Sequence, residues 1–265
     1  DASMKVRITD AMVNAAPRLR IISTATTGSD HIERGALATR GIPVRTLKED
    51  PHVLRNITPA AELSWTLVMA CARKLTAAVK HVNEGAWTRE LFPGLMMNGR
   101  SLGLIGCGRI GGWMSRYAQA FGMRVQAYDP YRASFPEGVE PASLQQVMAT
   151  SDVISVHVHL SDETRGLVSR ALFETVKPGT IFINTSRGAI ADEAALLDGL
   201  ISGRIGAAGL DVLDGEPDTR DHPLVRYART QDNLLITPHI GGNTVESLEK
   251  AETFLAGRVV EALGP

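Results

Sequence analysis

The chain has 265 residues, of which 44% are hydrophobic and 22% are charged, and its formal net charge at pH 7 is −1. This composition is typical of a globular protein and excludes a disordered or fibrous chain. The near-neutral charge predicts no nucleic-acid surface, and no apolar stretch reaches the ~20 residues that a membrane span needs. Cys71 and Cys107 form no CxxC motif, which fits a reducing compartment. We therefore expect a cytoplasmic protein that binds neither nucleic acid nor membrane.

The first hundred residues predict a small α/β unit. Short β-rich runs at residues 19–23 and 42–46 are expected to be strands, with a helix over 29–40 between them. A long apolar-rich helix is expected over 59–83, because no early helix breaker interrupts it. The turn-rich segment 92–100 then predicts a domain boundary.

From residue 99 onward, strand and helix patterns alternate regularly. Strands are expected over 101–105, 124–128, 152–156, 180–184, 207–210 and 233–236, and helices over 109–121, 169–175, 192–202 and 244–262. Strands separated by helices predict β-α-β units, so a doubly wound α/β fold with a parallel sheet is the expected architecture. We place the larger domain at residues 99–239 and assign residues 1–98 with 240–265 to the smaller one.

A glycine-rich motif follows the first strand of the larger domain. Residues 106–111 are Gly-Cys-Gly-Arg-Ile-Gly, a G-x-G-x-x-G motif between an expected strand and an expected helix. Gly106 permits a tight turn, Gly108 lets backbone approach a pyrophosphate, and Gly111 lets the helix pack close to the strand. Asp129 ends the next strand, where its carboxylate can bind ribose hydroxyls and repel a 2′-phosphate. The motif therefore predicts dinucleotide binding, with NAD preferred over NADP.

Three polar residues follow later strands of the expected sheet. Arg187, Glu216 and His239 each lie beyond the carboxyl end of a strand, and these ends meet at one edge of a parallel sheet. Hydride transfer to a 2-oxo acid needs a cation for the carboxylate and an acid for the carbonyl oxygen. Arg187 offers a planar charged fork for the carboxylate, and a carboxylate beside His239 favours its imidazolium and orients it.

Taken together, these motifs resemble the D-isomer-specific 2-hydroxyacid dehydrogenase family, which includes phosphoglycerate, glyoxylate/hydroxypyruvate and D-lactate dehydrogenases. The matching segments are 26–32, 106–111, 157–164, 177–188, 209–212, 216–217 and 237–242, in family order over almost the whole chain. The resemblance implies a Rossmann NAD domain and a smaller, incomplete, flavodoxin-like substrate domain. It further implies an oxidoreductase that transfers a hydride between NAD(H) and a small D-2-hydroxy acid or its 2-oxo acid.

The resemblance also implies roles for individual residues toward the substrate. Arg187 would bind the carboxylate and polarise the carbonyl group. His239 would be the general acid/base, and Glu216 would pair with it. The backbone amides of Thr27 and Gly28 would hold the carboxylate from the smaller domain.

For the cofactor, the resemblance implies that Asp211 meets the nicotinamide carboxamide. No metal is expected: His157 and His159 could form a metal pair on one strand face, but no third ligand of matching spacing follows. His159 stands where the family usually has proline. The complete set of expected cofactor-binding residues is Gly106, Gly108, Arg109, Ile110, Gly111, Asp129, His157, Thr164, Thr185, Asp211 and Gly241.

The beginning of the chain departs from the family pattern. Family members start with further strand-helix units, of which residues 9–17 resemble only the tail, and the first residue is Asp1 rather than Met. The expected strand at 19–23 would then present an unpaired apolar edge, which native sheets usually cover. We therefore expect a longer native polypeptide, with upstream residues that contribute to substrate specificity.

Three further expectations concern assembly and alternatives. The resemblance favours a homodimer whose interface includes the 59–80 helix with Trp65 and Met69, although these residues could also be ordinary core. Cys107 could be sensitive to oxidation or an inert filler of the phosphate loop. An NAD(H)-sensing binding protein, similar to corepressors that resemble this family, is the alternative function, whereas formate dehydrogenase is disfavoured because Glu216 would then be glutamine.

Overall fold

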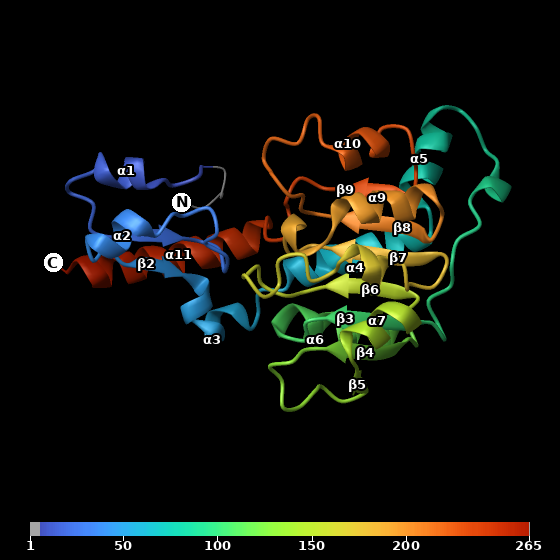
Figure 1. The fold of residues 1–265 in the computed structure, drawn as a ribbon, viewed down its shortest axis with the longest axis horizontal. Coiled ribbons are helices and arrows are strands. Elements are labelled where there is room, and N and C mark those ends of the chain that lie inside the picture. The colour runs from blue at the N-terminus through green and yellow to red at the C-terminus, as the bar shows by residue number, and fades with distance from the viewer. Residues whose placement is uncertain (1–5, 265) are drawn as a thin grey trace. The chain divides into compact units, whose positions relative to one another are not determined.

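The computed structural model describes residues 6–264 and divides into two compact units (Figure 1). The larger unit is Ala60–Gly241, and the smaller unit combines Asp1–Pro59 with Gly242–Pro265. Residues 1–5, on which the expectation of a longer native chain partly rests, lie outside the described residues. Across the described part of the chain, the helices are too short or too polar to cross a membrane.

A seven-stranded parallel sheet, built within the described residues 101–236, forms the framework of the larger unit. Its strand order is β5-β4-β3-β6-β7-β8-β9. The chain enters at β3 in the middle, winds outward to β5, returns to β6 and winds outward again to β9. This confirms the predicted doubly wound topology, whose switch point between β3 and β6 is where such sheets bind ligands. The strands are β3 (Ser101–Ile105), β4 (Arg124–Tyr128), β5 (Val139–Pro141), β6 (Val153–Val156), β7 (Thr180–Asn184), β8 (Ile205–Leu210) and β9 (Leu234–Ile236).

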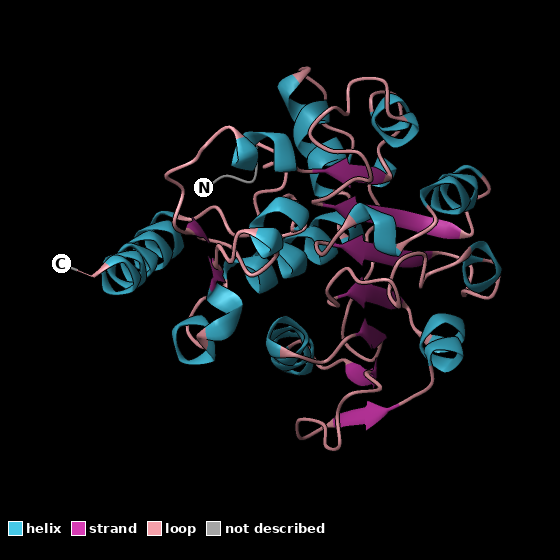
Figure 2. Cartoon of the chain, turned by 60° about the vertical axis from the view of Figure 1, so that its left-hand side comes forward, coloured by secondary structure: helices cyan, strands magenta, loops and turns pink. Residues whose placement is uncertain are grey.

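Helices cover both faces of this sheet (Figure 2). On one face, α4 (Pro59–Ala72) and α6 (Arg109–Ala120) pack on a cluster that includes Ile181 and Ile183 of β7. On the other face, α7 (Leu144–Thr150), α8 (Arg170–Phe173), α9 (Glu193–Ile201) and α10 (Pro223–Ala228) pack on a cluster that includes Phe182. Successive residues of β7 therefore point to opposite faces, and both faces are apolar, as a parallel sheet between two helical layers requires.

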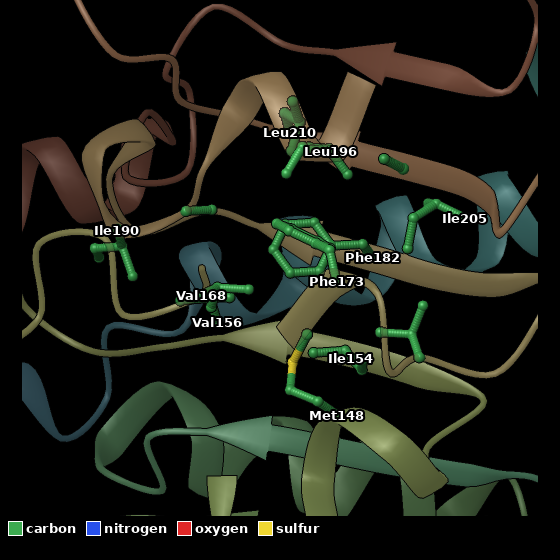
Figure 3. Packing of buried hydrophobic residues seen from close by; sticks show 14 of the residues in the cluster. Met148, Ile154, Val156, Val168, Phe173, Phe182, Ile190, Leu196, Ile205 and Leu210 are labelled. Atoms are coloured by element: carbon green, nitrogen blue, oxygen red, sulfur yellow. The ribbon is translucent and has the colours of Figure 1, made fainter. Parts of the chain in front are cut away.

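The second cluster is centred on an aromatic pair (Figure 3). The rings of Phe173 and Phe182 lie 5.1 Å apart at 69°, in an edge-to-face arrangement. Met148, Ile154 and Leu196 are fully buried around them, so residues from α7, β6 and α9 meet at one point. This packing fixes α9 relative to β7, and the loop between these two elements carries Arg187.

The predicted helix over 59–83 is wrong in one respect, because it is two helices. After α4 the chain passes Lys74, whose φ is +50°, and α5 (Leu75–Asn83) begins at the next residue. A left-handed residue cannot continue a right-handed helix, and no proline or glycine marks this break in the sequence. Leu67 and Val68 of α4 are buried against the sheet cluster. Residues 60–98 consequently belong to the larger unit, whereas the sequence analysis assigned them to the smaller domain.

The smaller unit contains a two-stranded parallel sheet formed by β1 (Ile22–Thr24) and β2 (Val44–Thr46). The last helix returns to this unit, where its Ala251 and Leu255 are buried against Leu47 and Leu54. Local signals therefore located the elements, although the first strand lies further along than predicted and the following helix is shorter. The remaining elements are α1 (Asp10–Asn14), α2 (Gly35–Thr39), η1 (Leu47–Glu49), α3 (Pro51–Leu54), η2 (Arg89–Leu91), η3 (Gly188–Ile190) and α11 (Val245–Leu263).

The left-handed break at Lys74 yields a prediction for stability. We expect Lys74→Gly to raise the free energy of unfolding by about 0.5–1 kcal/mol, because relief of the Cβ clash exceeds the added entropy of unfolded glycine. Lys80→Gly, at an exposed helical position of α5, should instead lower it by about 1 kcal/mol. Urea denaturation measures both, and a Lys74→Gly protein less stable than wild type would contradict this account.

Candidate active site

The glycine motif forms a tight turn between β3 and α6. Gly106 has φ +92°, its N–H donates to the Tyr128 carbonyl at 2.8 Å, and a Cβ there would lie 2.7 Å from the His157 carbonyl oxygen. Gly111 is buried, and a side chain there would run into the Gly106 carbonyl group. Gly108 caps α6, is exposed, and has open space where its Cβ would be. The open side of the turn therefore coincides with the N-terminus of a 12-residue helix, where backbone N–H groups favour a phosphate.

Asp129 is tied to this turn rather than exposed at the end of β4. Its carboxylate accepts the Cys107 N–H at 2.9 Å and the Tyr131 N–H at 3.2 Å. Arg132 donates to the Cys107 carbonyl and, through Nε, to the Ser134 carbonyl at 2.9 Å. Burial raises the pKa of the Cys107 thiol, which keeps it protonated at neutral pH and favours the inert role over the oxidation-sensitive one.

One ring nitrogen of His157 is buried without a hydrogen-bond partner in the structure. Its Nε2 lies 2.8 Å from Ser155 Oγ, while its Nδ1 is buried and has no hydrogen-bond partner in the structure. Burial lowers the pKa of His157 to about 3, so the ring is neutral at physiological pH. Buried polar atoms are rarely left unpaired, and a bound dinucleotide would offer the missing group. The glycine turn, the helix N-terminus and this orphaned atom together fit NAD.

The other expected cofactor-binding residues lie at the start of α6 or on loops that follow strands of the sheet. Arg109 and Ile110 begin α6. Thr164 closes the loop after β6, where its hydroxyl donates to the His159 carbonyl at 2.6 Å. Thr185 follows β7, and its hydroxyl lies 2.7 Å from that of Ser64 on α4. Within residues 6–264, no group of three or more His, Cys, Asp or Glu side chains is placed to hold a metal ion.

The structure joins Glu216 directly to His239. His239 Nδ1 lies 2.5 Å from Glu216 Oε1, and both side chains are about two-thirds buried, with exposed fractions of 31% and 29%. The second oxygen of Glu216 accepts the Leu213 N–H at 3.3 Å, which fixes the carboxylate. Because Glu216 engages Nδ1, Nε2 is the ring nitrogen that can exchange a proton with a substrate.

Asp211 holds the turn that carries His239. One of its carboxylate oxygens accepts from Thr237 Oγ1 at 2.6 Å and the Ile240 N–H at 2.8 Å, and the other accepts the Gly241 N–H at 2.7 Å. Burial raises the pKa of Asp211, and these hydrogen bonds oppose that effect. His239, with φ +54°, is thus kept in a conformation that non-glycine residues rarely adopt. Sequence reasoning placed Asp211 near the cofactor but missed this second role, and Thr237 with it.

Arg187 lies on a loop that touches the loop of Glu216. Asn184, the last residue of β7, donates through Nδ2 to the Arg187 carbonyl at 2.9 Å and accepts the Ser186 N–H at 3.0 Å, which fixes the turn. Gly188 follows so close to the backbone of Leu213 and Asp214 that any side chain would clash. The loops after β7 and β8 are therefore packed together, with Arg187 on one and Glu216 on the other.

Thr27 and Gly28 belong to the smaller unit. They lie on the loop that follows β1, where the Thr26 hydroxyl donates to the Gly28 carbonyl at 2.6 Å. The expected role of their backbone amides toward the substrate carboxylate stays a prediction.

Comparisons with known proteins agree with this geometry. Residues 65–241 match the family model described as D-isomer specific 2-hydroxyacid dehydrogenase, NAD binding domain. The chain is 39% identical over 253 residues to D-3-phosphoglycerate dehydrogenase of Mycobacterium tuberculosis, covering 94% of this chain and 46% of that protein. It is 35% identical over 258 residues to hydroxypyruvate reductase of Thermotoga maritima, covering 97% of this chain and 82% of the reductase.

A solved structure is also similar. D-lactate dehydrogenase from Aquifex aeolicus, complexed with NAD and lactic acid, superposes with a TM-score of 0.83 at 29% identity, covering 96% of this chain and 79% of that one. The chain spans about half the length of the phosphoglycerate dehydrogenases that it matches, at 46%.

The clamp formed by Asp211 can be tested by stability. Asp211→Asn retains one oxygen acceptor but places an amide NH2 against donors that now lack a partner. We expect the free energy of unfolding to fall by about 1–3 kcal/mol, the cost of leaving buried donors unsatisfied. Denaturant titration measures the loss, with Asp218→Asn at an exposed position as the control. Equal stability of the two variants would show that the clamp is not stabilising.

Proposed function

Because the chain belongs to the D-isomer specific 2-hydroxyacid dehydrogenases, a family of NAD-binding oxidoreductases, we propose that it transfers a hydride between NAD(H) and a small D-2-hydroxy acid or its 2-oxo acid. The observation that carries the proposal is the His239–Glu216 pair, with 2.5 Å between Nδ1 and Oε1, at the carboxyl edge of the sheet that bears the glycine turn. A dinucleotide turn and an acid/base pair on one sheet edge are the two parts that such a reaction needs.

The proposed chemistry divides among three side chains. NADH, when bound, supplies the hydride. His239, as imidazolium, gives a proton from Nε2 to the carbonyl oxygen while Glu216 balances the charge on the ring and holds its orientation. Arg187 binds the carboxylate through paired N–H groups and fixes the carbonyl for attack. In the reverse direction the neutral imidazole takes the hydroxyl proton.

A further substrate-binding role is proposed for two backbone amides. The backbone amides of Thr27 and Gly28 are proposed to donate hydrogen bonds to the carboxylate, a role that follows from the family resemblance. The relatives are named for phosphoglycerate, hydroxypyruvate and D-lactate, all small 2-hydroxy or 2-oxo acids, which supports the same substrate class here.

The reaction is tested by incubating the protein with NADH and separate 2-oxo acids, including pyruvate, glyoxylate, hydroxypyruvate and 3-phosphohydroxypyruvate, and by following NADH absorbance. We expect turnover with at least one acid, and a D-configured product by chiral chromatography. Tight NADH binding without turnover of any acid would instead support the NAD(H)-sensing alternative.

Substitution of the two cationic residues should separate their roles. His239→Ala should lower turnover by roughly 10²–10⁴-fold while NADH affinity holds, because only proton transfer is lost. Arg187→Lys should raise KM for the 2-oxo acid and lower kcat, because lysine is a point charge that cannot form the paired hydrogen bonds. Steady-state kinetics and fluorescence titration with NADH measure both; full activity of His239→Ala would remove it from the mechanism.

We also propose a preference for NADH over NADPH. The Asp129 carboxylate lies at the end of β4, and Arg132, which could neutralise a 2′-phosphate, is engaged by the carbonyls of Cys107 and Ser134. Charge repulsion should weaken NADPH binding by about 10- to 100-fold relative to NADH. Asp129→Asn keeps an oxygen acceptor for the Cys107 N–H but removes the negative charge. It should therefore reduce the difference between the dissociation constants of NADH and NADPH. Equal dissociation constants in the wild type would contradict the proposal.

A homodimer is proposed, with an interface that overlaps the predicted 59–80 segment at α5 but does not include Trp65 and Met69. Trp65 packs within the larger unit, its ring 4.9 Å from that of Phe121, and Met69 packs against the same core. Large exposed apolar side chains instead gather on α5 and the segment after it. These are Leu75, Val79, Val82, Trp87, Leu91, Leu95 and Met96, of which Trp87 is 87% exposed. An apolar patch of this kind typically marks a protein interface.

The proposed interface is tested by light scattering coupled to gel filtration. Wild-type protein should elute with the mass of a dimer at micromolar concentration. Val79→Glu, which places a charge in the patch on α5, should shift it to a monomer. Val245→Glu, at an equally apolar exposed position on α11 of the smaller unit, should leave the dimer intact. A monomeric wild type, or a dimeric Val79→Glu protein, would reject this interface.

A further inference from the structure

The loop that carries Glu216 is held by residues outside the acid/base pair. Gly188 packs directly against the backbone of Leu213 and Asp214. Close to Gly188, Glu193, the first residue of α9, accepts the Asp214 N–H on Oε1 at 3.0 Å. Two residues later the chain reaches Glu216. A shift of Glu193 would therefore move the loop that sets the position of the Glu216 carboxylate.

Glu193 is in turn fixed by His222, the N-cap of α10. His222 Nε2 lies 3.0 Å from Glu193 Oε2, and the exposed fractions of the two side chains are 16% and 14%. His222 Nδ1 accepts the Leu224 N–H at 3.3 Å, so this nitrogen carries no proton and Nε2–H is the donor to Glu193. Burial lowers the pKa of His222, which agrees with a neutral ring. A hydrogen bond thus joins the N-terminus of α9 to that of α10, and Glu193 also bonds to the loop that carries Glu216.

The charges around Glu193 are mainly negative. Asp214 and Glu216 face it from the loop, and His222 faces it from α10 as a neutral group. Burial, with a contribution from those two carboxylates, raises the pKa of Glu193 to about 7, while the Asp214 N–H opposes the shift. Because folding raises this pKa, the folded protein loses stability as pH rises from the ordinary glutamate range to about 7, and the loss persists at higher pH. A compensating use of the group is therefore expected.

We propose that Glu193 and His222 form a positioning pair for the acid/base residues, holding the loop at Asp214 so that Glu216 stays in hydrogen-bond contact with His239. The pair touches neither reacting atom. Its effect passes through geometry, by fixing the loop, and through charge, because an ionised Glu193 adds to the negative potential that favours the His239 imidazolium. This inference rests on the roles proposed above for Glu216 and His239.

The first variant removes the charge and keeps the hydrogen bond to the loop. Glu193→Gln retains an oxygen for the Asp214 N–H, but its amide group faces the Nε2–H of His222. We expect kcat for 2-oxo acid reduction to fall by about 10- to 100-fold, the range for a small misplacement of reacting groups, with unchanged NADH affinity. The pH at which activity is half-maximal should move to lower values, because His239 loses its proton more easily. Glu140→Gln, at an exposed position on β5, is the matched control.

Two substitutions of His222 separate positioning from folding. Asparagine places an oxygen where Nδ1 lies and keeps the cap of α10, but it cannot reach Glu193. Glutamine reaches Glu193 with an N–H donor but loses the cap. We expect His222→Asn, which leaves Glu193 Oε2 without its donor, to share the lowered kcat of Glu193→Gln. His222→Gln should melt below the wild type because the cap is lost, yet retain more turnover than His222→Asn. Turnover that simply follows thermal stability in the two variants would overturn the proposal.

A measurement without substrate keeps this proposal separate from the proposed function. Histidine-selective NMR gives the pKa of His239 in the wild type and in Glu193→Gln, assigned with His239→Ala. We expect a lower pKa in Glu193→Gln and none of this shift in Glu140→Gln. An inactive wild type would reject the proposed function while this titration still tests the positioning pair. An unchanged His239 pKa in Glu193→Gln would overturn the proposed positioning role of Glu193 and His222.

Discussion

The buried carboxylate of Asp211 binds the turn after β9 at three points, and the geometry of the candidate active site depends on this one side chain. Without it, the left-handed His239 would keep its own bonds to the Asp211 carbonyl and to Glu216, but Thr237, Ile240 and Gly241 on either side would lose a shared acceptor. With it, the imidazole lies within hydrogen-bond distance of Glu216, and the loops that follow β8 and β9 are held together. A carboxylate suits this purpose because it accepts several N–H and O–H donors at once. Because Asp211 is buried, bulk water does not supply an alternative acceptor for these donors.

Around that clamp, the site shows how a parallel sheet concentrates charge. The loops after β7, β8 and β9 lie at the same edge of the sheet, and these loops carry Arg187, Glu216 and His239, which are far apart in the sequence. The same geometry brings Glu193, Asp214 and Glu216 together, and such a cluster of carboxylates is costly unless hydrogen bonds and a cation share its charge. An imidazolium at His239 and the cationic fork of Arg187 are suited to that role.

Large parts of the fold were predictable because their signals are local. The strands β3 and β7 have the predicted bounds, since residues of a strand buried on both faces form short apolar runs between turn residues. The bounds of β4 were also predicted correctly, although only alternate residues of this strand are buried. The cap residues Asp192 and Thr244 stand where the predicted helices begin. By contrast, β5 and α7 were missed, because a three-residue edge strand carries little pattern and the helix after it is short. The cap of α7 at Ser143 was a signal that could have been used.

The sequence by itself determined the family, the doubly wound sheet, the cofactor turn and which residues are proposed as the acid/base pair, because each depends on residue types at fixed spacing beside a strand. Only the tertiary structure decided what holds these residues in place. The break at Lys74, the second role of Asp211 and the contact between Glu193 and His222 join groups that no local pattern relates. The physical reason is that a hydrogen bond needs its atoms within about 3 Å, and only packing of distant segments sets such distances.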